Sequence, residues 1–212
     1  MRKLPVYLVI DTSGSMKGEK IEAVINGIQI LISSLRKDQT AIETVELSVI
    51  TFDDKARILI PLTELLSFEM VDITAKGISE LGAALNLLCC RIKVDVKIQT
   101  SEHEGDWKPI VFILTDGMPT DDWVGAVGLL KSSNIGVCVA CAIGDDTDFE
   151  VLKCITNDVI HITNMDTVRI NNFFCWISNT ITTRSVHIDN NIMITKGLNE
   201  LPAPLLGLNI VK

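Results

Sequence analysis

The stretch LPVYLVIDTSGSM, residues 4–16, changes from a continuous apolar run to one carboxylate followed by three hydroxyl side chains. An apolar run without alternation is typical of a strand buried on both faces, as in a parallel sheet covered by helices on both sides. The segment Glu19–Arg36 follows, and its apolar residues recur every three or four positions, which predicts a long amphipathic helix. The stretch is therefore predicted to be the turn between a central strand and a helix.

The rest of the chain continues this alternation of strand-like and helix-like segments. Further strand-like runs cover residues 45–52, 56–61, 109–115, 135–143 and 159–163, and helical periodicity covers residues 81–94, 122–134, 148–155 and 167–183. We therefore expect an α/β fold with a doubly wound, mostly parallel six-stranded sheet and helices on both faces, as in Rossmann-like proteins. The short Asp-Asp-Lys link after residue 52 predicts a hairpin, which makes one edge strand antiparallel.

Length and composition are compatible with one sizeable domain. The chain has 212 residues, of which 47% are hydrophobic. We assign residues 1–184 to this domain and residues 185–212 to a C-terminal appendage that docks on it. The appendage contains SVHIDNNIMIT, which could form a small hairpin around Asn190 and Asn191.

Charge and apolar patterning exclude several classes of protein. A net charge of −8 opposes binding to nucleic acids and to anionic membranes. No apolar run approaches the roughly 18 residues of a membrane span. The first apolar run includes Pro5 and ends at Asp11 without a cleavage site, so it does not predict a signal peptide. We therefore expect a cytoplasmic protein.

The six cysteines lie in apolar stretches, which favours buried, reduced thiols over disulfides or a zinc site. Cys138 and Cys141 have the spacing of a redox motif. They lie within a predicted strand, where their side chains are expected to point to opposite faces. The three histidines are isolated from other metal-binding side chains in the sequence, so they do not predict a metal site.

Two aspartates are predicted to meet at one edge of the sheet. Asp11 ends the first strand, and Asp116 follows the strand at residues 109–115 in the sequence LTDGMPTDD. In a doubly wound sheet, ligands bind beyond the carboxyl ends of the strands, where the strand order reverses. If the two strands are neighbours, both carboxylates reach the same crevice.

The residues after Asp11 suggest which ligand this crevice holds. Ser13 and Ser15 flank Gly14 and are expected to point the same way as Asp11, whereas DTSGSMKGEK lacks the spacing of glycines and lysine that a phosphate-binding loop needs. Hydroxyl and carboxylate oxygens with little charge suit Mg²⁺ better than zinc or calcium. The alternative is structural, because serines near a helix start can cap free backbone amides.

The arrangement of three loops resembles the metal-ion-dependent adhesion site (MIDAS) of von Willebrand factor A domains. The resemblance lies in the D-x-S-x-S pattern from Asp11, the T-D-G pattern around Asp116, and GISELGAAL at residues 77–85. In the third loop, Ser79 stands where the family has a threonine and Ile78 where it has a glycine. The whole layout is most similar to the bacterial tellurite-resistance proteins of the TerY type.

This resemblance implies a von Willebrand factor A fold and a metal-dependent interaction module rather than an enzyme. The implied metal ligands are Asp11, Ser13, Ser15, Ser79 and Asp116, and the implied ion is Mg²⁺, with Mn²⁺ also possible. A protein partner would complete the coordination with an aspartate or glutamate. The TerY-type likeness implies a role in stress response or tellurite resistance, with a Ser/Thr phosphatase or a protein kinase as a possible partner.

Two other functional hypotheses remain open from the sequence. The first is a magnesium-dependent phosphohydrolase with Asp11 as nucleophile and Asp116 as metal ligand. The general acid that haloacid-dehalogenase-like enzymes need two positions after the nucleophile is replaced by Ser13. The second is a scaffold whose partner surface lies on the appendage.

Overall fold

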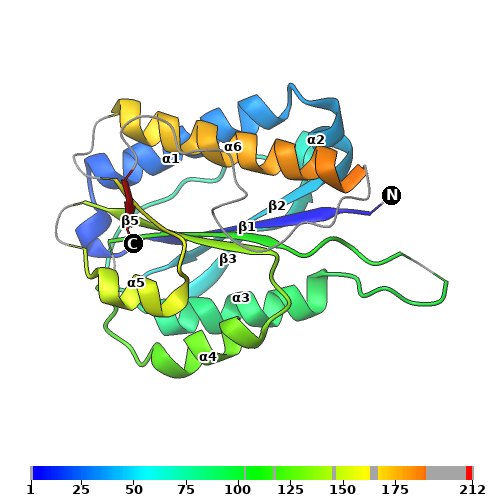
Figure 1. The fold of residues 1–212 in the computed structure, drawn as a ribbon. Helices are drawn as coiled ribbons and strands as arrows, with labels where there is room; N and C mark the ends of the chain where they lie inside the picture. Colours follow the sequence, from blue (N-terminus) through cyan, green and yellow to red (C-terminus); the bar gives the residue numbers. More distant parts are fainter. Residues whose placement is uncertain are drawn as a thin grey trace.

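A computed structural model of the chain describes residues 2–102, 104–116, 118–144, 147–162, 167–189 and 209–211. Within these residues the structure is one seven-stranded sheet between two layers of helices (Figure 1). The strands are β1 (Leu4–Asp11), β2 (Val45–Phe52), β3 (Ala56–Glu64), β4 (Ile110–Thr115), β5 (Val137–Ile143), β6 (Val159–Ile162) and β7 (Asn209–Val211).

The strand order is β3-β2-β1-β4-β5-β6-β7. The six predicted strands form, β1, β4 and β5 lie in the middle, and β2 and β3 make the predicted antiparallel hairpin. The sequence analysis missed β7, which pairs antiparallel with β6, so the sheet has a second antiparallel edge strand. A three-residue strand carries too little periodicity to be recognised from sequence.

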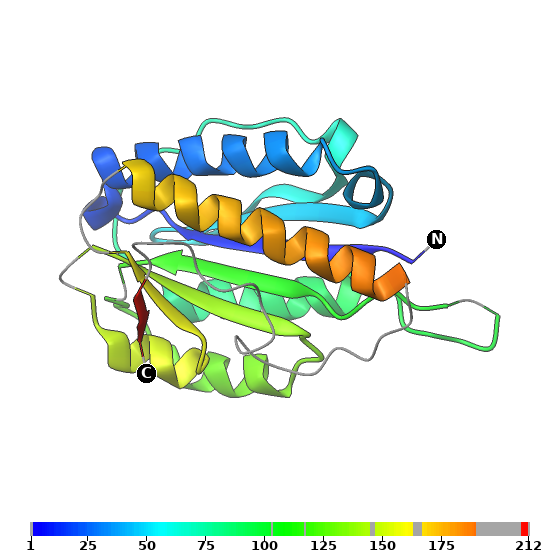
Figure 2. The same ribbon diagram turned by 45° about the horizontal axis from the view of Figure 1, so that its top comes forward.

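The helices cover both faces of the sheet, as predicted (Figure 2). On one face lie α1 (Glu19–Leu35), α2 (Gln39–Thr44) and α6 (Thr167–Asp189), and on the other lie α3 (Leu81–Asp95), α4 (Val124–Ser132) and α5 (Phe149–Ile155). The sequence analysis missed α2 because six residues are too few to show a helical period. Among the described residues, no helix has the length and apolar character needed to cross a bilayer.

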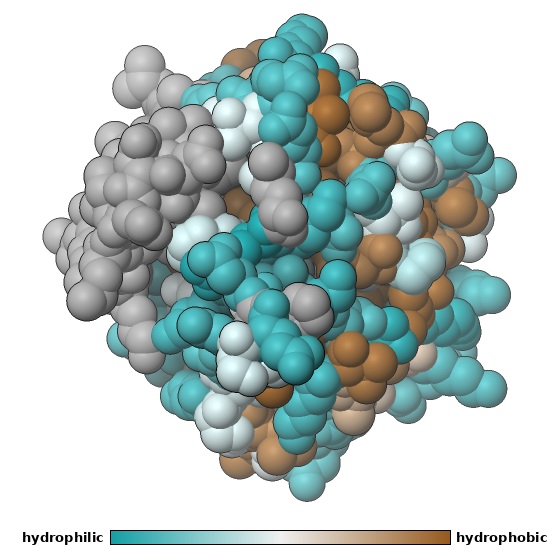
Figure 3. All heavy atoms as spheres, turned by 90° about the vertical axis from the view of Figure 1, so that its right-hand side faces the viewer, coloured by the Kyte–Doolittle hydropathy of each residue, from teal (hydrophilic) through white to brown (hydrophobic). Residues whose placement is uncertain are grey.

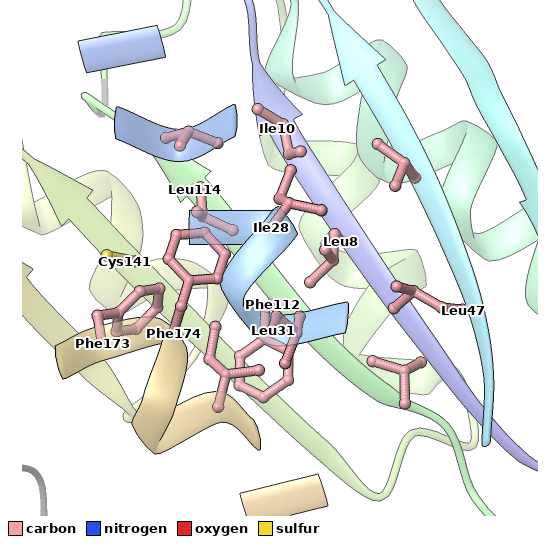
Figure 4. Close-up of a cluster of buried hydrophobic side chains, with 14 of the residues drawn as sticks. Leu8, Ile10, Ile28, Leu31, Leu47, Phe112, Leu114, Cys141, Phe173 and Phe174 are labelled. Atoms are coloured by element: carbon pink, nitrogen blue, oxygen red, sulfur yellow. The ribbon is translucent and has the colours of Figure 1, made fainter. Parts of the chain in front are cut away.

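Side-chain alternation along β1 explains its continuous apolar sequence. Val6, Leu8 and Ile10 join the core cluster under α1 and α6. Tyr7 and Val9 join the cluster under α3, α4 and α5. Figure 4 shows the first cluster, in which side chains from α1 and α6 meet those of the sheet. A strand buried on both faces needs apolar side chains at every position.

The appendage begins differently from the prediction. Residues 185–189 continue α6 and do not form the first strand of a hairpin. Asn190 and Asn191, the expected turn, lie outside the described residues. The short strand β7 belongs to this appendage and joins the sheet edge.

The prediction that all six cysteines are buried was wrong for two of them. Cys90 and Cys154 are exposed, on α3 and α5, and all six thiols are free. The redox-motif interpretation is excluded as expected, because Cys141 belongs to the core cluster on one face of the sheet and Cys138 packs against the cluster on the other. Burial raises the pKa of the Cys138 thiol to about 12, which leaves it protonated and unreactive at neutral pH.

The connection between α3 and β4 projects from the end of the molecule where the strands begin (Figure 1). Most of residues 97–104 are exposed, as the polar sequence predicts, and His103 lies outside the described residues. Figure 3 views this end and shows hydrophobic side chains scattered among hydrophilic ones. Asp106 holds the base of the loop, because its carboxylate accepts hydrogen bonds from the backbone amides of Lys3 (3.2 Å) and Lys97 (2.9 Å).

Candidate metal centre

The structure brings the two predicted aspartates to the same edge of the sheet. Strands β1 and β4 are parallel neighbours, so Asp11 and Asp116 both lie at their carboxyl ends. This is the point where the strand order reverses, since the chain moves from β1 toward β2 on one side and later returns to β4 on the other. Both carboxylates are buried.

Asp11 is held by hydrogen bonds from three elements. One of its oxygens, Oδ1, accepts a bond from the amide of Ser13 (2.8 Å). The other, Oδ2, accepts bonds from the hydroxyls of Ser79 (2.9 Å) and Thr115 (2.7 Å). Burial raises the pKa of Asp11, the hydrogen bonds partly oppose that effect, and the nearby charge of Asp116 adds to the rise. A bound cation would relieve this electrostatic cost.

Ser13 and Ser15 lie side by side as the sequence predicts. Their hydroxyl oxygens are 3.0 Å apart, and Ser13 is buried whereas Ser15 is exposed. The helix-capping alternative is not supported. The side chain of Ser13 makes no capping hydrogen bond to the short helix at residues 14–16, and α1 has Gly18 at its N-cap. The two hydroxyls therefore have no structural role in starting a helix.

Asp116 is under-satisfied for a buried carboxylate. Its Oδ1 atom is buried and has no hydrogen-bond partner among the described residues. Its Oδ2 atom lies 3.4 Å from the ammonium of Lys20, near the start of α1. A buried oxygen without a partner is costly, which is why such an atom is usually explained by a ligand, an ion or water.

Backbone contacts hold the loop that carries Ser79 against the loop that follows β1. The amide of Lys76 donates to the carbonyl of Thr12 (2.7 Å), and the amide of Gly14 donates to the carbonyl of Gly77 (2.9 Å). A Cβ at Gly14 would lie 3.2 Å from that carbonyl oxygen, so the glycine permits the close approach. These bonds place the Ser79 hydroxyl beside Asp11.

Thr120 and Asp121 hold the segment after Asp116 against the Ser79 loop and the start of α3. The sequence analysis did not identify these contacts. The amide and hydroxyl of Thr120 both donate to the carbonyl of Ser79, at 2.8 and 3.0 Å. The carboxylate of Asp121 accepts bonds from the amides of Gly82 (3.1 Å) and Ala83 (2.9 Å), at the start of α3. Asp121 therefore caps a helix distant in sequence, and no local pattern reveals such a cap.

Thr115 was also missed as a site residue, although it directly precedes Asp116. Its sequence signal is the threonine of the T-D-G pattern, at the last position of β4. Met16, which follows Ser15, is fully buried. In contrast, two apolar side chains near the ligands in the sequence are exposed: Ile78 (51% exposed), which precedes Ser79, and Met118 (58% exposed), two residues after Asp116.

The side chains fit a small hard cation. The neighbouring donors are carboxylate and hydroxyl oxygens, and no group of three histidine, cysteine or acidic side chains suited to a metal occurs among the described residues. Hydroxyl and carboxylate oxygens with few charges are suited to Mg²⁺, which keeps part of its water shell. The unpartnered Asp116 oxygen is compatible with a direct or water-mediated ligand.

Comparisons with known proteins agree with the fold. Similar solved structures include a von Willebrand factor type A protein from Catenulispora acidiphila (16% identity, TM-score 0.64) and the ArnB paralog VWA2 from Sulfolobus acidocaldarius (16% identity, TM-score 0.60). Each alignment covers 85% of this chain, with 43% and 45% of the respective solved chains. A third is proximal thread matrix protein 1 from the mussel byssus with a zinc-occupied MIDAS motif.

The mussel protein is 17% identical with a TM-score of 0.61, over 87% of this chain and 46% of its own. The chain thus spans less than half the length of these three proteins. No curated protein sequence matches the chain. The family model of the von Willebrand factor type A domain matches residues 6–174, which is most of the sequence. The chain therefore belongs to the von Willebrand factor type A domain family.

Proposed function

We propose that the protein is a Mg²⁺-dependent protein-interaction module whose metal centre captures a carboxylate of a partner protein. The ligands would be Asp11, Ser13, Ser15, Ser79 and Asp116, directly or through water. The observation that carries the proposal is the buried Oδ1 atom of Asp116, which lacks a partner among the described residues, at the sheet edge where the hydroxyls of Ser13, Ser15 and Ser79 gather around Asp11. Mn²⁺, which also accepts oxygen ligands, is an alternative ion.

The charge of the ligand set supports capture of an anion. Asp11 and Asp116 at most neutralise a divalent ion, and the three serine hydroxyls add no charge. The metal therefore keeps its attraction for a further carboxylate. A third acidic ligand would weaken that attraction, and none is found near these residues in the described structure.

The surroundings and the sequence resemblance suggest the kind of partner. Ile78 and Met118 are exposed apolar residues within two positions of Ser79 and Asp116 in the sequence, so we expect apolar side chains near the captured acidic residue. The TerY-type resemblance suggests a cytoplasmic role in stress response or tellurite resistance, with a Ser/Thr phosphatase or protein kinase as partner.

A phosphohydrolase fits the geometry less well. Both carboxylate oxygens of Asp11 already accept hydrogen bonds, three in total, which reduces their nucleophilicity. Ser13 occupies the position that a general acid would need, and its hydroxyl lies against Ser15. We therefore propose binding without catalysis.

The test combines metal binding with partner capture. Isothermal titration should show Mg²⁺ binding to the wild type and none to Asp11→Ala, with both variants folded by circular dichroism. Affinity capture from native lysate should then retain a partner in Mg²⁺ but not in chelator, and not on Asp11→Ala. Asp106→Ala, which removes a carboxylate from the opposite end of the sheet, is the matched control and should capture normally. Equal capture with and without Mg²⁺ would refute the proposal.

A further inference from the structure

Lys20 extends a positive charge into the metal centre. Its ammonium lies 3.4 Å from Oδ2 of Asp116, and its side chain is only 25% exposed. None of the motifs that predict the metal centre includes this residue. The ammonium partly neutralises the negative charge of a proposed metal ligand, as a bound metal ion would do.

The position of Lys20 within α1 is electrostatically unfavourable for a positive charge. It lies in the first turn of α1, where the helix dipole favours acidic residues, and Glu19 and Glu22 follow that preference. The ion pair with Asp116 offsets this local cost. The ion pair with Asp116 therefore explains a lysine at position 20 better than its place in α1 does.

The path of the side chain is kept open by Gly144, at the end of β5. A Cβ on Gly144 would lie 3.2 Å from Cε and 3.3 Å from Nζ of Lys20. The backbone of Gly144 is itself held in place, because its amide donates to the carbonyl of Ile162 (3.1 Å) and its carbonyl lies 2.8 Å from a ring nitrogen of His161. Lys20 thus runs past a constrained glycine to reach the carboxylate.

We propose that Lys20 is a built-in counter-ion that stabilises the metal-free centre and competes with the divalent ion for Asp116. This inference rests on the proposed metal site. Without metal, the ammonium pairs with Asp116, one of the two carboxylates of the centre, so the local charge is reduced from two negatives to one. With a divalent ion bound, the same ammonium makes the centre net positive, which weakens metal retention and strengthens the attraction for a partner's carboxylate.

The experiment compares the full-length wild type with Lys20→Met, which keeps the length and apolar character of the side chain but removes its charge. Lys17→Met is the control, because Lys17 is exposed and has no ion pair among the described residues. We expect Lys20→Met to bind Mg²⁺ roughly tenfold more tightly by isothermal titration. Without metal, its melting temperature should fall by about 2–4 °C. Lys17→Met should change neither quantity.

The outcomes separate this inference from the proposed function. If wild type and Lys20→Met bind Mg²⁺ with the same affinity and melt alike in chelator, the counter-ion role is wrong and the metal site stands. If neither binds Mg²⁺ or Mn²⁺, the metal site itself is wrong and the inference falls with it. Lys20→Arg keeps the charge and should behave as the wild type does. An arginine variant that matches Lys20→Met instead would show that packing, not charge, causes the effect.

Discussion

Asp106 and Asp116 lie at opposite ends of the sheet and use their carboxylates in opposite ways. Each oxygen of Asp106 accepts a hydrogen bond from a backbone amide, of Lys3 and of Lys97, and so holds the α3–β4 connection against β1. Asp116 is more deeply buried, yet its Oδ1 atom has no partner within the described residues, and its Oδ2 atom has a long contact with Lys20.

The difference shows how to separate a structural carboxylate from a ligand. A carboxylate whose two oxygens both accept hydrogen bonds from backbone amides, as in Asp106, stabilises the fold. A buried carboxylate with an unmatched oxygen costs stability, and that cost is recovered when an ion binds. The two aspartates flank the same strand in the sequence, but Asp106 precedes β4, whereas Asp116 follows its carboxyl end, where ligands bind in such sheets.

The largest expected effect is on Asp116. Asp116→Asn keeps the shape of the side chain but removes its charge, so Mg²⁺ affinity should fall by about 100-fold or more. The unfolding free energy without metal should change by less than about 1 kcal/mol, because the lost ion pair between Oδ2 and Lys20 is offset by removal of the buried charge whose Oδ1 atom has no partner among the described residues. Isothermal titration and urea unfolding in chelator measure the two quantities. Unchanged Mg²⁺ affinity would remove Asp116 from the ligand set.

Asp106 should show the reverse pattern. Asp106→Ala removes two hydrogen bonds to backbone amides, so the unfolding free energy should fall by about 1–3 kcal/mol. Mg²⁺ affinity should stay the same. Glu102→Ala, an exposed acidic residue of the same connection, controls for the lost charge and should alter neither quantity. Weaker Mg²⁺ binding by Asp106→Ala would contradict the distinction drawn between a structural Asp106 and a metal-binding Asp116.

Ser79 tests whether the hydroxyl beside Asp11 belongs to the metal centre. Ser79→Ala removes the hydroxyl that donates to Oδ2 of Asp11 and should weaken Mg²⁺ binding by about tenfold. The amide and the hydroxyl of Thr120 donate to the backbone carbonyl of residue 79, not to its side chain, so these bonds should hold the loop in place. Titration of the variant gives the result. A loss of folding, measured by circular dichroism, would assign Ser79 to structure instead.

The smallest expected effect comes from restoring the threonine that the family resemblance implies. Ser79→Thr keeps the hydroxyl and adds a methyl that restricts its rotation, so Mg²⁺ affinity should rise by about two- to threefold. Parallel titrations of the wild type and the variant are sensitive enough for this difference. Weaker binding would mean that the buried site has no room for the methyl group.

Much of the fold could be predicted because its signals are local. The apolar run of β1, the period of α1 and the short β2–β3 turn each appear within one segment of sequence. The short elements α2 and β7 were missed because six and three residues show no period. The start of the appendage was misassigned, since residues 185–189 prolong α6. Their place in a helix depends on the preceding turns more than on their own pattern.

The candidate site divides in the same way. Asp11, Ser13, Ser15 and Asp116 follow strand ends and could be found from sequence, as could Ser79 from the family resemblance. Thr120, Asp121 and Lys20 act on residues far away in the chain, and no local spacing reveals those contacts.

The sequence by itself determined which segments become strands and helices, because burial on one or two faces leaves a residue pattern that each segment carries alone. It also determined that two carboxylates stand at the ends of strands, and the tertiary structure made those strands neighbours. Only the tertiary structure decided which of those carboxylate oxygens accept hydrogen bonds and which one has no partner among the described residues. That distinction depends on donors from other elements, and packing, not local sequence, decides where those donors lie.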